Sequence, residues 1–348
     1  MTEYCSLGSL LEELRSLFPP ALIGDSGWER VQALTTRLPI YTTESRFGFE
    51  FDLCDPSPTA DFAVFLAPRS RLATFYEQQT EETAPGLIGP GFGPFLWEQG
   101  RDPQSLFTRT GAGVILEYDL ATPPPGQHSP PGIFIVTLDG PEQQQARLHD
   151  EPTALVAALE SAAGWERGVA DIRRVDRVRA AVADAGIVAQ AGVMPGRNLR
   201  AIRLIIQGVG NANVAGMLKR LQWNGDPSLA VSALSDLTGL VKPQTGLSID
   251  VTSQGVSPRL GLELFRPIEW HQTDRAGWKL LFDRLVEKEW CLPTKADGLA
   301  EWPGIEIFFG QDGVYKVRQT INHIKLVIDR GAVRVKGYAA VDVLRTAP

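Results

Sequence analysis

The sequence predicts an α+β fold, an antiparallel ten-stranded β-barrel built from five αββα (helix–hairpin–helix) repeats with the helices outside. Three observations predict it. Pairs of segments that alternate apolar and polar residues recur roughly every seventy residues. Short turns join the members of each pair, which makes them antiparallel hairpins, and helical patterns separate the pairs. An open sheet of ten strands has two exposed edges, so closure into a barrel is favoured.

The five hairpins are expected in chain order as follows. The predicted strand pairs are 46–53 with 62–68, 113–120 with 133–138, 186–194 with 199–208, 246–252 with 259–265, and 321–328 with 333–341. Pro195-Gly196 and Asp329-Arg330-Gly331 supply turn chemistry to the third and fifth pairs. Helices are expected at 24–38, 162–185, 213–223, 227–240 and 276–290, and a Gly/Pro-rich crossing loop or lid at 83–94. No linker interrupts the pattern, which predicts a single domain over residues 1–348.

The strand alternation predicts which residues face the barrel interior. Helices bury their apolar stripe on the apolar face of each strand, so that face is the outside and the polar face points inward. The repeated segments FEFDL (49–53) and LEYDL (116–120) then place an acid inside the barrel within an apolar run. The alternative is a two-layer α+β sheet whose polar face meets water.

Composition narrows the function classes. The net charge of −7 argues against a nucleic-acid partner, which needs a basic face. The three cysteines and four histidines are scattered without metal-ligand spacing, so no metal site is expected and free thiols suit a reducing compartment. The N-terminus lacks the pattern of a signal peptide, and no apolar run is long enough for a membrane span. A cytoplasmic location is therefore expected.

The predicted interior carries an uneven set of charges. A ten-stranded barrel is too wide for side chains to fill, which predicts a central chamber. Four carboxylates face it from alternating positions of the N-terminal hairpins: Glu50, Asp52, Glu117 and Asp119. The later hairpins contribute the candidates Arg203, Arg259, Lys325, Arg334, Lys336 and Tyr338. Cations that converge without carboxylate partners repel one another, so they suggest a bound polyanion such as a diphosphate. A surface ion pair is the alternative for each cation taken singly.

Two short motifs and the topology resemble the aromatic prenyltransferases of the ABBA or PT-barrel group, including the dimethylallyltryptophan-synthase branch. Arg334-Val335-Lys336-Gly337-Tyr338 is similar to that branch's diphosphate-binding R-x-K-x-Y strand motif. Residues 113–119, GVILEYD, are similar to the strand whose glutamate holds an indole N–H, although the family's proline is absent and Asp replaces its Ser.

The resemblance implies roles for the candidate residues. Glu117, with Glu50 as a second interior acid, would orient or deprotonate the acceptor. Arg334 and Lys336 would bind the diphosphate, completed by Lys325, Arg203 and Arg259, and Tyr338 would shield an allylic cation. The family usually places R-x-K-x-Y nearer the middle of the chain, and a second K-x-Y motif is missing here. No NDxxD or DDxxD motif is present, so neither a metal nor another cofactor is implied.

The function expected from these features is transfer of a prenyl group from an allylic diphosphate donor to an aromatic, indolic or peptide acceptor in specialised metabolism. One alternative is a non-catalytic barrel that binds an anionic small molecule or peptide for partner enzymes. Another is an enzyme of the same fold that acts on a different phosphorylated or cyclising substrate, because fold does not fix function. A barrel interior filled by side chains would count against both ligand-binding hypotheses.

Overall fold

The computed structural model describes residues 4–121, 129–137, 150–166, 168, 172–197, 200–266 and 274–346. Eleven strands form one sheet. They are β1 (Phe47–Asp52), β2 (Asp61–Leu66), β3 (Ala112–Tyr118), β4 (Gly132–Thr137), β5 (Ile187–Val193), β6 (Ile202–Gly210), β7 (Gln244–Thr252), β8 (Gly255–Leu264), β9 (Gly304–Gly310), β10 (Gly313–Asp329) and β11 (Ala332–Thr346).

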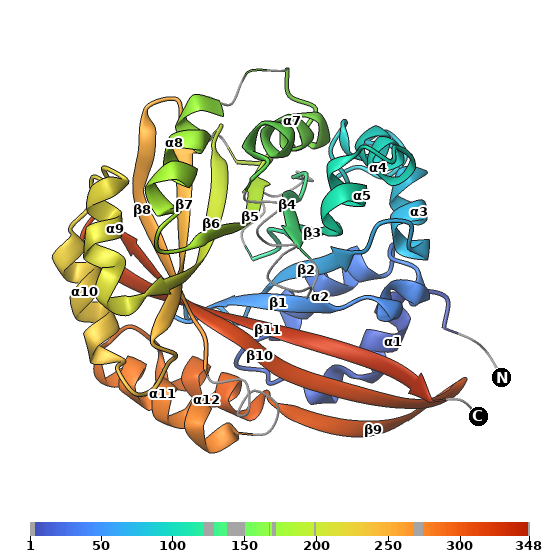
Figure 1. Cartoon of the computed structure of the whole chain (residues 1–348). Helices are drawn as coiled ribbons and strands as arrows, with labels where there is room; N and C mark the ends of the chain where they lie inside the picture. The colour runs from blue at the N-terminus through green and yellow to red at the C-terminus, as the bar shows by residue number, and fades with distance from the viewer. Residues whose placement is uncertain are drawn as a thin grey trace.

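The sheet closes into an antiparallel barrel. Strands β1 to β8 follow one another in chain order, β8 pairs with β10, β10 pairs with β11, and β11 returns to β1. Ten strands therefore form the closed ring, as predicted. The eleventh, β9, pairs with the first half of β10 outside the ring. Figure 1 shows β10 and β11 running on past the barrel to meet β9.

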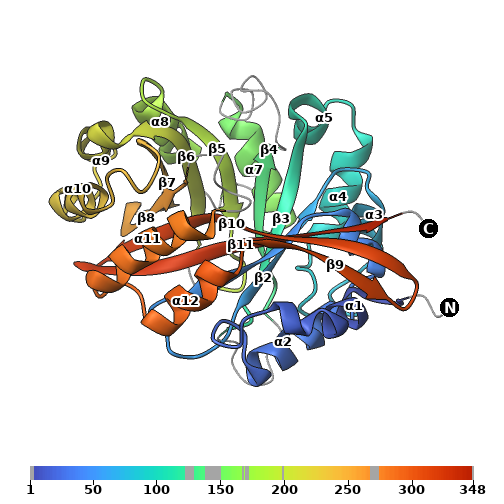
Figure 2. The ribbon, with the colours of Figure 1, turned by 90° about the horizontal axis from the view of Figure 1, so that it is seen from below.

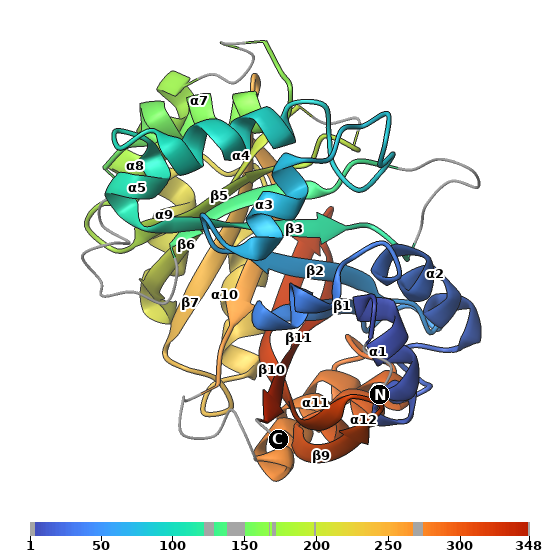
Figure 3. The ribbon, with the colours of Figure 1, turned by 90° about the vertical axis from the view of Figure 1, so that its right-hand side faces the viewer.

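The helices lie around the outside of the barrel (Figures 2 and 3). The α-helices are α1 (Leu7–Glu13), α2 (Asp25–Thr35), α3 (Arg71–Glu77), α4 (Phe92–Arg101), α5 (Leu106–Thr110), α7 (Pro152–Ala162), α8 (Ile172–Val182), α9 (Val214–Arg220), α10 (Pro227–Asp236), α11 (Arg275–Glu287) and α12 (Pro293–Glu301). Short 3-10 helices η1 (Arg15–Leu17), η2 (Ile40–Glu44) and η3 (Asn211–Asn213) complete them.

Strand β1 shows why the helices cover the apolar face. Phe49 and Phe51 are buried, and their rings lie 5.8 and 5.5 Å from the ring of Trp302, which follows α12. Phe49 also meets Phe18 edge to face at 5.6 Å. Between them, Glu50 turns to the inside, where it lines the interior cavity. The predicted direction of FEFDL is therefore confirmed.

Several boundaries differ from the sequence predictions. Strand β9 and the first half of β10 were missed, and β8 begins at Gly255, which leaves a tight turn instead of the expected 253–258 loop. The end of the predicted 83–94 loop belongs to α4. The predicted helix over 162–185 is represented by the end of α7 and by α8, while 167 and 169–171 lie outside the described residues, as do His128, His149 and His271.

The described part of the chain contains neither a membrane-spanning helix nor a cluster of metal-binding side chains. None of its helices is both long and apolar enough to cross a membrane. Within the same residues, no group of three or more His, Cys, Asp or Glu side chains gathers where it could hold a metal ion.

Candidate functional site

One cavity lies inside the barrel, and seven strands contribute to its lining. Its residues are Glu50, Glu117, Arg197, Arg203, Ser248, Asp250, Arg259, Gly261, Lys325, Val327, Lys336 and Tyr338. The free space among them is about 20 Å³, room for about one water molecule. The wide chamber expected for ten strands is therefore absent, because long charged side chains occupy it. This counts against a ligand site unless some of those side chains move.

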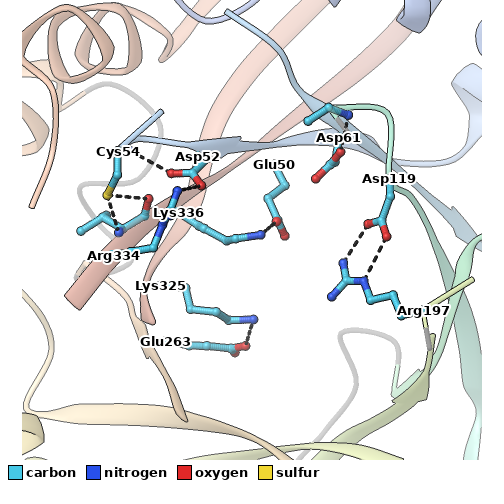
Figure 4. Close-up of polar contacts among 12 residues, drawn as sticks. Glu50, Asp52, Cys54, Asp61, Asp119, Arg197, Glu263, Lys325, Arg334 and Lys336 are labelled. Carbon is cyan, nitrogen blue, oxygen red and sulfur yellow. Dashed lines mark hydrogen bonds and ion pairs between the residues drawn. The ribbon is translucent and has the colours of Figure 1, made fainter. Parts of the chain in front are cut away.

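The cavity brings together seven of the eight residues to which the sequence resemblance gives a role. Arg334 is the exception, although it lies on the same strand as Lys336 and Tyr338. Its side chain is 55% exposed and reaches Asp52, with 2.6 Å between guanidinium and carboxylate. This pair stands apart from the Lys336–Glu50 pair in Figure 4. The structure thus places the first residue of the R-x-K-x-Y motif outside the cavity lining.

Carboxylates on neighbouring elements pair with four of the lining cations. Arg203 of β6 makes a two-pronged contact with Asp250 of β7 at 2.7 and 3.0 Å, because these residues are directly opposite in the sheet. Arg197 binds Asp119 in the same manner at 2.8 and 3.0 Å. The other two pairs are Lys325 with Glu263 and Lys336 with Glu50, both visible in Figure 4.

This pairing corrects the expectation of cations without partners. Arg259 alone among the five lining cations has no ion pair with any residue that the structure describes, and it lies close enough to Asp250 to lower the pKa of that carboxyl. Its guanidinium keeps its hydrogen-bonding capacity for another group. Most cations of the interior are therefore paired with carboxylates, and Arg259 remains available to bind another group.

Glu50 and Glu117 occupy opposite electrostatic environments in the same cavity. Burial favours the neutral form of Glu50, but the charges of Lys336 and Lys325 overcome it and lower its pKa to about 2. Burial and the nearby charge of Glu50 raise the pKa of Glu117 to about 7, against the weaker pull of Lys325 and Arg203. No described residue donates a hydrogen bond to the Glu117 side chain. A carboxyl that titrates near neutrality can accept or donate a proton.

A stack of three rings stands beside the charged pairs. The imidazole of His323 lies parallel to the Tyr338 ring at 4.2 Å and packs at 5.1 Å against Phe265. The Lys325 ammonium lies 5.0 Å from the centre of the same tyrosine ring. Burial lowers the pKa of His323 to about 4, and neither ring nitrogen has a hydrogen-bond partner among the residues that the structure describes. The histidine is therefore neutral near pH 7 and serves as an aromatic support for Tyr338.

An apolar cluster fills another part of the interior. It consists of Phe65, Ile115, Phe134, Val136 and Ile205, and it is separate from the core beneath the helices. Ile115 and Glu117 are two residues apart on β3, so they share the inward face. The charged region and the apolar region of the barrel interior are therefore next to each other, since β3 contributes one residue to each.

Sequence reasoning missed several members of the site. Arg197 follows β5 in the turn after Pro195-Gly196. Strand alternation does not predict which way a side chain points in a turn. Asp250 sits on a polar strand position, so alternation placed it inward, but its pairing with Arg203 depends on cross-strand register. Glu263 lies on the inward face of β8 opposite Lys325, and the same register information was needed to find it.

Comparisons with protein-family models and with curated proteins find no match for this chain. The cavity combines arginine and lysine side chains, which are donors suited to polyanions, with the Glu117 carboxyl, whose pKa of about 7 suits proton exchange.

Proposed function

We propose that the barrel is a prenyltransferase that moves an allylic prenyl group from a diphosphate donor to an aromatic, indolic or peptide acceptor. One observation carries this proposal: five cationic side chains and the proton-exchanging carboxyl of Glu117 line a single cavity. Two further features support it. The order of two or more helices before each barrel hairpin resembles the αββα repeat of the PT-barrel enzymes, and an apolar cluster shares the barrel interior with the charged residues, where an isoprenoid chain would pack once side chains have moved.

In this proposal the diphosphate of the donor replaces interior carboxylates as the binding partner of the lining cations. Arg259 offers the first contact because its guanidinium has no carboxylate of its own among the described residues. Arg203 and Lys336 then turn from Asp250 and Glu50 to the phosphate oxygens, since a diphosphate carries more charge than one carboxylate. Because the free space is about 20 Å³, a donor enters only when side chains move. Arg334 is exposed and pairs with Asp52, and its proposed role is to attract the anion from solvent.

The chemical step follows from these positions. The bond between prenyl carbon and diphosphate oxygen breaks, and its electron pair leaves with the diphosphate, stabilised by the cations. The allylic cation is shielded by the face of Tyr338 that is not stacked on His323, after the Lys325 ammonium has turned from that ring to the diphosphate. A ring carbon or heteroatom of the acceptor supplies the electron pair for the new bond, and the proton that the acceptor loses passes to the carboxylate of Glu117. Such a reaction, requiring neither metal nor other cofactor, fits cytoplasmic specialised metabolism.

The experiment that tests this proposal measures turnover. The protein is incubated with dimethylallyl, geranyl or farnesyl diphosphate and with tryptophan or a tryptophan-containing peptide. Acceptor-dependent pyrophosphate release and a product heavier by one prenyl group are expected. Glu117→Gln should lower the rate at least about 100-fold, the usual contribution of a proton-transfer group. Lys279→Ala, an exposed change on α11, should keep the full rate. Absence of product with every donor would refute the proposed reaction.

A second candidate is a non-catalytic barrel that binds an anionic small molecule or peptide for partner enzymes. The pairing of four of the five lining cations with carboxylates favours it, because an anion bound at Arg259 alone leaves those pairs intact, whereas the proposed reaction needs Arg203 and Lys336 to exchange partners. Donor binding measured by calorimetry without any pyrophosphate release would support this candidate. Neither binding nor release would contradict both.

A further inference from the structure

A three-stranded sheet projects from the barrel beyond the ring of ten strands. It consists of β9, the first half of β10 and the last residues of β11, with Ile307 opposite Lys316 and Lys316 opposite Leu344. One face of this projection is covered: Tyr315, Val317 and Val343 are buried, and the ring of Tyr4 lies 6.0 Å from that of Tyr315. Figure 1 shows β9 along the border of the molecule.

The other face of the projection exposes large apolar side chains on its two outer strands, with Val314, Lys316 and Arg318 of β10 between them. Ile305, Ile307 and Phe309 of β9 are 43%, 54% and 78% exposed, and Leu344 of β11 is 64% exposed. The cross-strand register puts all four on one face, because Ile305, Ile307 and Phe309 alternate along β9 and Leu344 shares the row of Ile307. Only two other large hydrophobic residues of the described chain, Trp97 and Leu280, are comparably exposed. Such clustering marks an interaction surface.

The outer edge of β9 is unprotected. In the described chain β9 pairs with β10 alone, so its outward N–H and C=O groups face solvent. Natural edge strands are usually blocked by lysine, proline or a bulge. The segment GIEIFFG contains neither residue, and its pairing with β10 has no register shift. The edge is therefore ready to accept another strand.

We propose that β9 pairs antiparallel with β9 of a second copy of this chain, giving a twofold homodimer with a continuous six-stranded sheet. The strand is self-complementary about Ile307. In that register Ile307 faces its own copy, Ile305 faces Phe309 of the second chain, and the terminal glycines Gly304 and Gly310 face each other. All the exposed apolar side chains of β9 then lie on one face of the joined sheet.

The position of Glu306 favours the same register. Glu306 is the only charged residue of β9, and pairing about Ile307 puts it opposite Phe308 on the other face. A shift of the axis by one residue toward the N-terminus would bring the two copies of Glu306 together, which is unfavourable. The symmetric pairing also uses all seven residues of the strand. A second copy therefore fits this edge in one preferred arrangement.

The test is the oligomeric state of the full chain, measured by light scattering and analytical ultracentrifugation over the micromolar range. The wild-type protein should have twice the 38.0 kDa mass of one chain. Ile307→Lys puts like charges opposite each other on the axis and should raise the dimer dissociation constant at least tenfold, about 1.4 kcal/mol. Leu280→Lys is the matched control, since Leu280 is 62% exposed on α11, and it should stay dimeric.

A charge-swap experiment fixes the register. Ile307→Lys and Ile307→Glu should each dimerise at least tenfold more weakly than the wild type, and an equimolar mixture should form a heterodimer more tightly than either variant forms a homodimer, because opposite charges then meet on the axis. Circular dichroism establishes that both variants are folded. A wild-type protein that is monomeric throughout, a dimer unaffected by Ile307→Lys, or an edge that binds an extended peptide and never a second copy would each overturn the proposal.

Discussion

Glu50 and Glu117 show how one residue type acquires two properties inside one barrel. Both face the cavity from neighbouring hairpins, yet Lys336 pairs only with Glu50. The paired carboxyl stays ionised with a pKa of about 2, and its charge helps to raise the pKa of Glu117 to about 7. The lysine contact thus decides which glutamate carries a proton near neutral pH. Alternation along the strands could predict that both are interior, but not which would be paired, because pairing depends on strand register.

The raised pKa of Glu117 predicts a pH-dependent stability. Its folded-state pKa of about 7 lies above the ordinary 4.5, so the folded protein retains a proton that the unfolded chain releases. Stability from this group is present at low pH and is lost as pH rises through 7. Glu117→Gln cannot ionise and should therefore stabilise the protein by about 1 to 3 kcal/mol near pH 8. The same change should be nearly neutral near pH 5.

Thermal unfolding at the two pH values measures this effect. Glu81→Gln, at an exposed position after α3, is the control and should change stability at neither pH. Equal effects of Glu117→Gln at both pH values would show that Glu117 is not held protonated by its surroundings.

At the scale of elements, the apolar part of the interior depends on glycines that face inward. The Phe134 ring of β4 lies over Gly192 of β5, the residue directly opposite it in the sheet. A Cβ added at Gly192 would fall 2.3 Å from that ring. The ring of Phe65 similarly occupies the space above Gly113 of β3. These strands therefore fit their interior because glycine alternates with large rings across the sheet.

Gly192→Ala should consequently destabilise the barrel by about 1 to 3 kcal/mol, the usual cost of overpacking. Gly89→Ala is the control, because its added Cβ would meet Pro130 at an ordinary 3.6 Å. Combining Gly192→Ala with Phe134→Leu should cost less than the sum of the two single changes, since the smaller side chain relieves the clash. Chemical denaturation measures the free energies of unfolding of the wild-type protein, the three single variants and the double variant. Strict additivity would mean that the ring does not pack on Gly192.

Element boundaries were predictable only where a strand belongs to the barrel. The alternation and turn chemistry located all five barrel hairpins, since each must present one face to helices and one to the interior. Residues 304–320 also alternate, as GIEIFFG and VYKVRQT, yet they form β9 and the outer half of β10, where neither barrel side applies. A local pattern cannot tell whether a strand ends at the rim of a barrel or continues past it.

For the whole molecule, closure was predictable and the filling of the interior was not. Ten strands joined as hairpins have no satisfactory open arrangement, so the ring follows from their number and direction. The width of the ring suggested an open chamber, but Arg197, Arg203, Lys325 and Lys336 reach inward to partners on other elements and occupy it. Only three-dimensional register brings those partners within reach. The interior is thus a network of paired charges, and the proposed diphosphate donor would bind there by replacing carboxylates as the partners of the cations.

Calorimetric titration of dimethylallyl diphosphate into the wild-type protein and into Arg259→Ala tests this account most directly. Arg259 has no ion pair among the described residues, and Asp250, whose pKa it helps to lower, keeps its contact with Arg203, so its removal should change the melting temperature little. The donor should bind the wild-type protein and should bind Arg259→Ala at least tenfold more weakly, a loss of about 1.4 kcal/mol. Lys279→Ala should bind as the wild type does. Absence of donor binding to the wild-type protein, or equal affinity for Arg259→Ala, would contradict the central claim that the barrel interior is a diphosphate site.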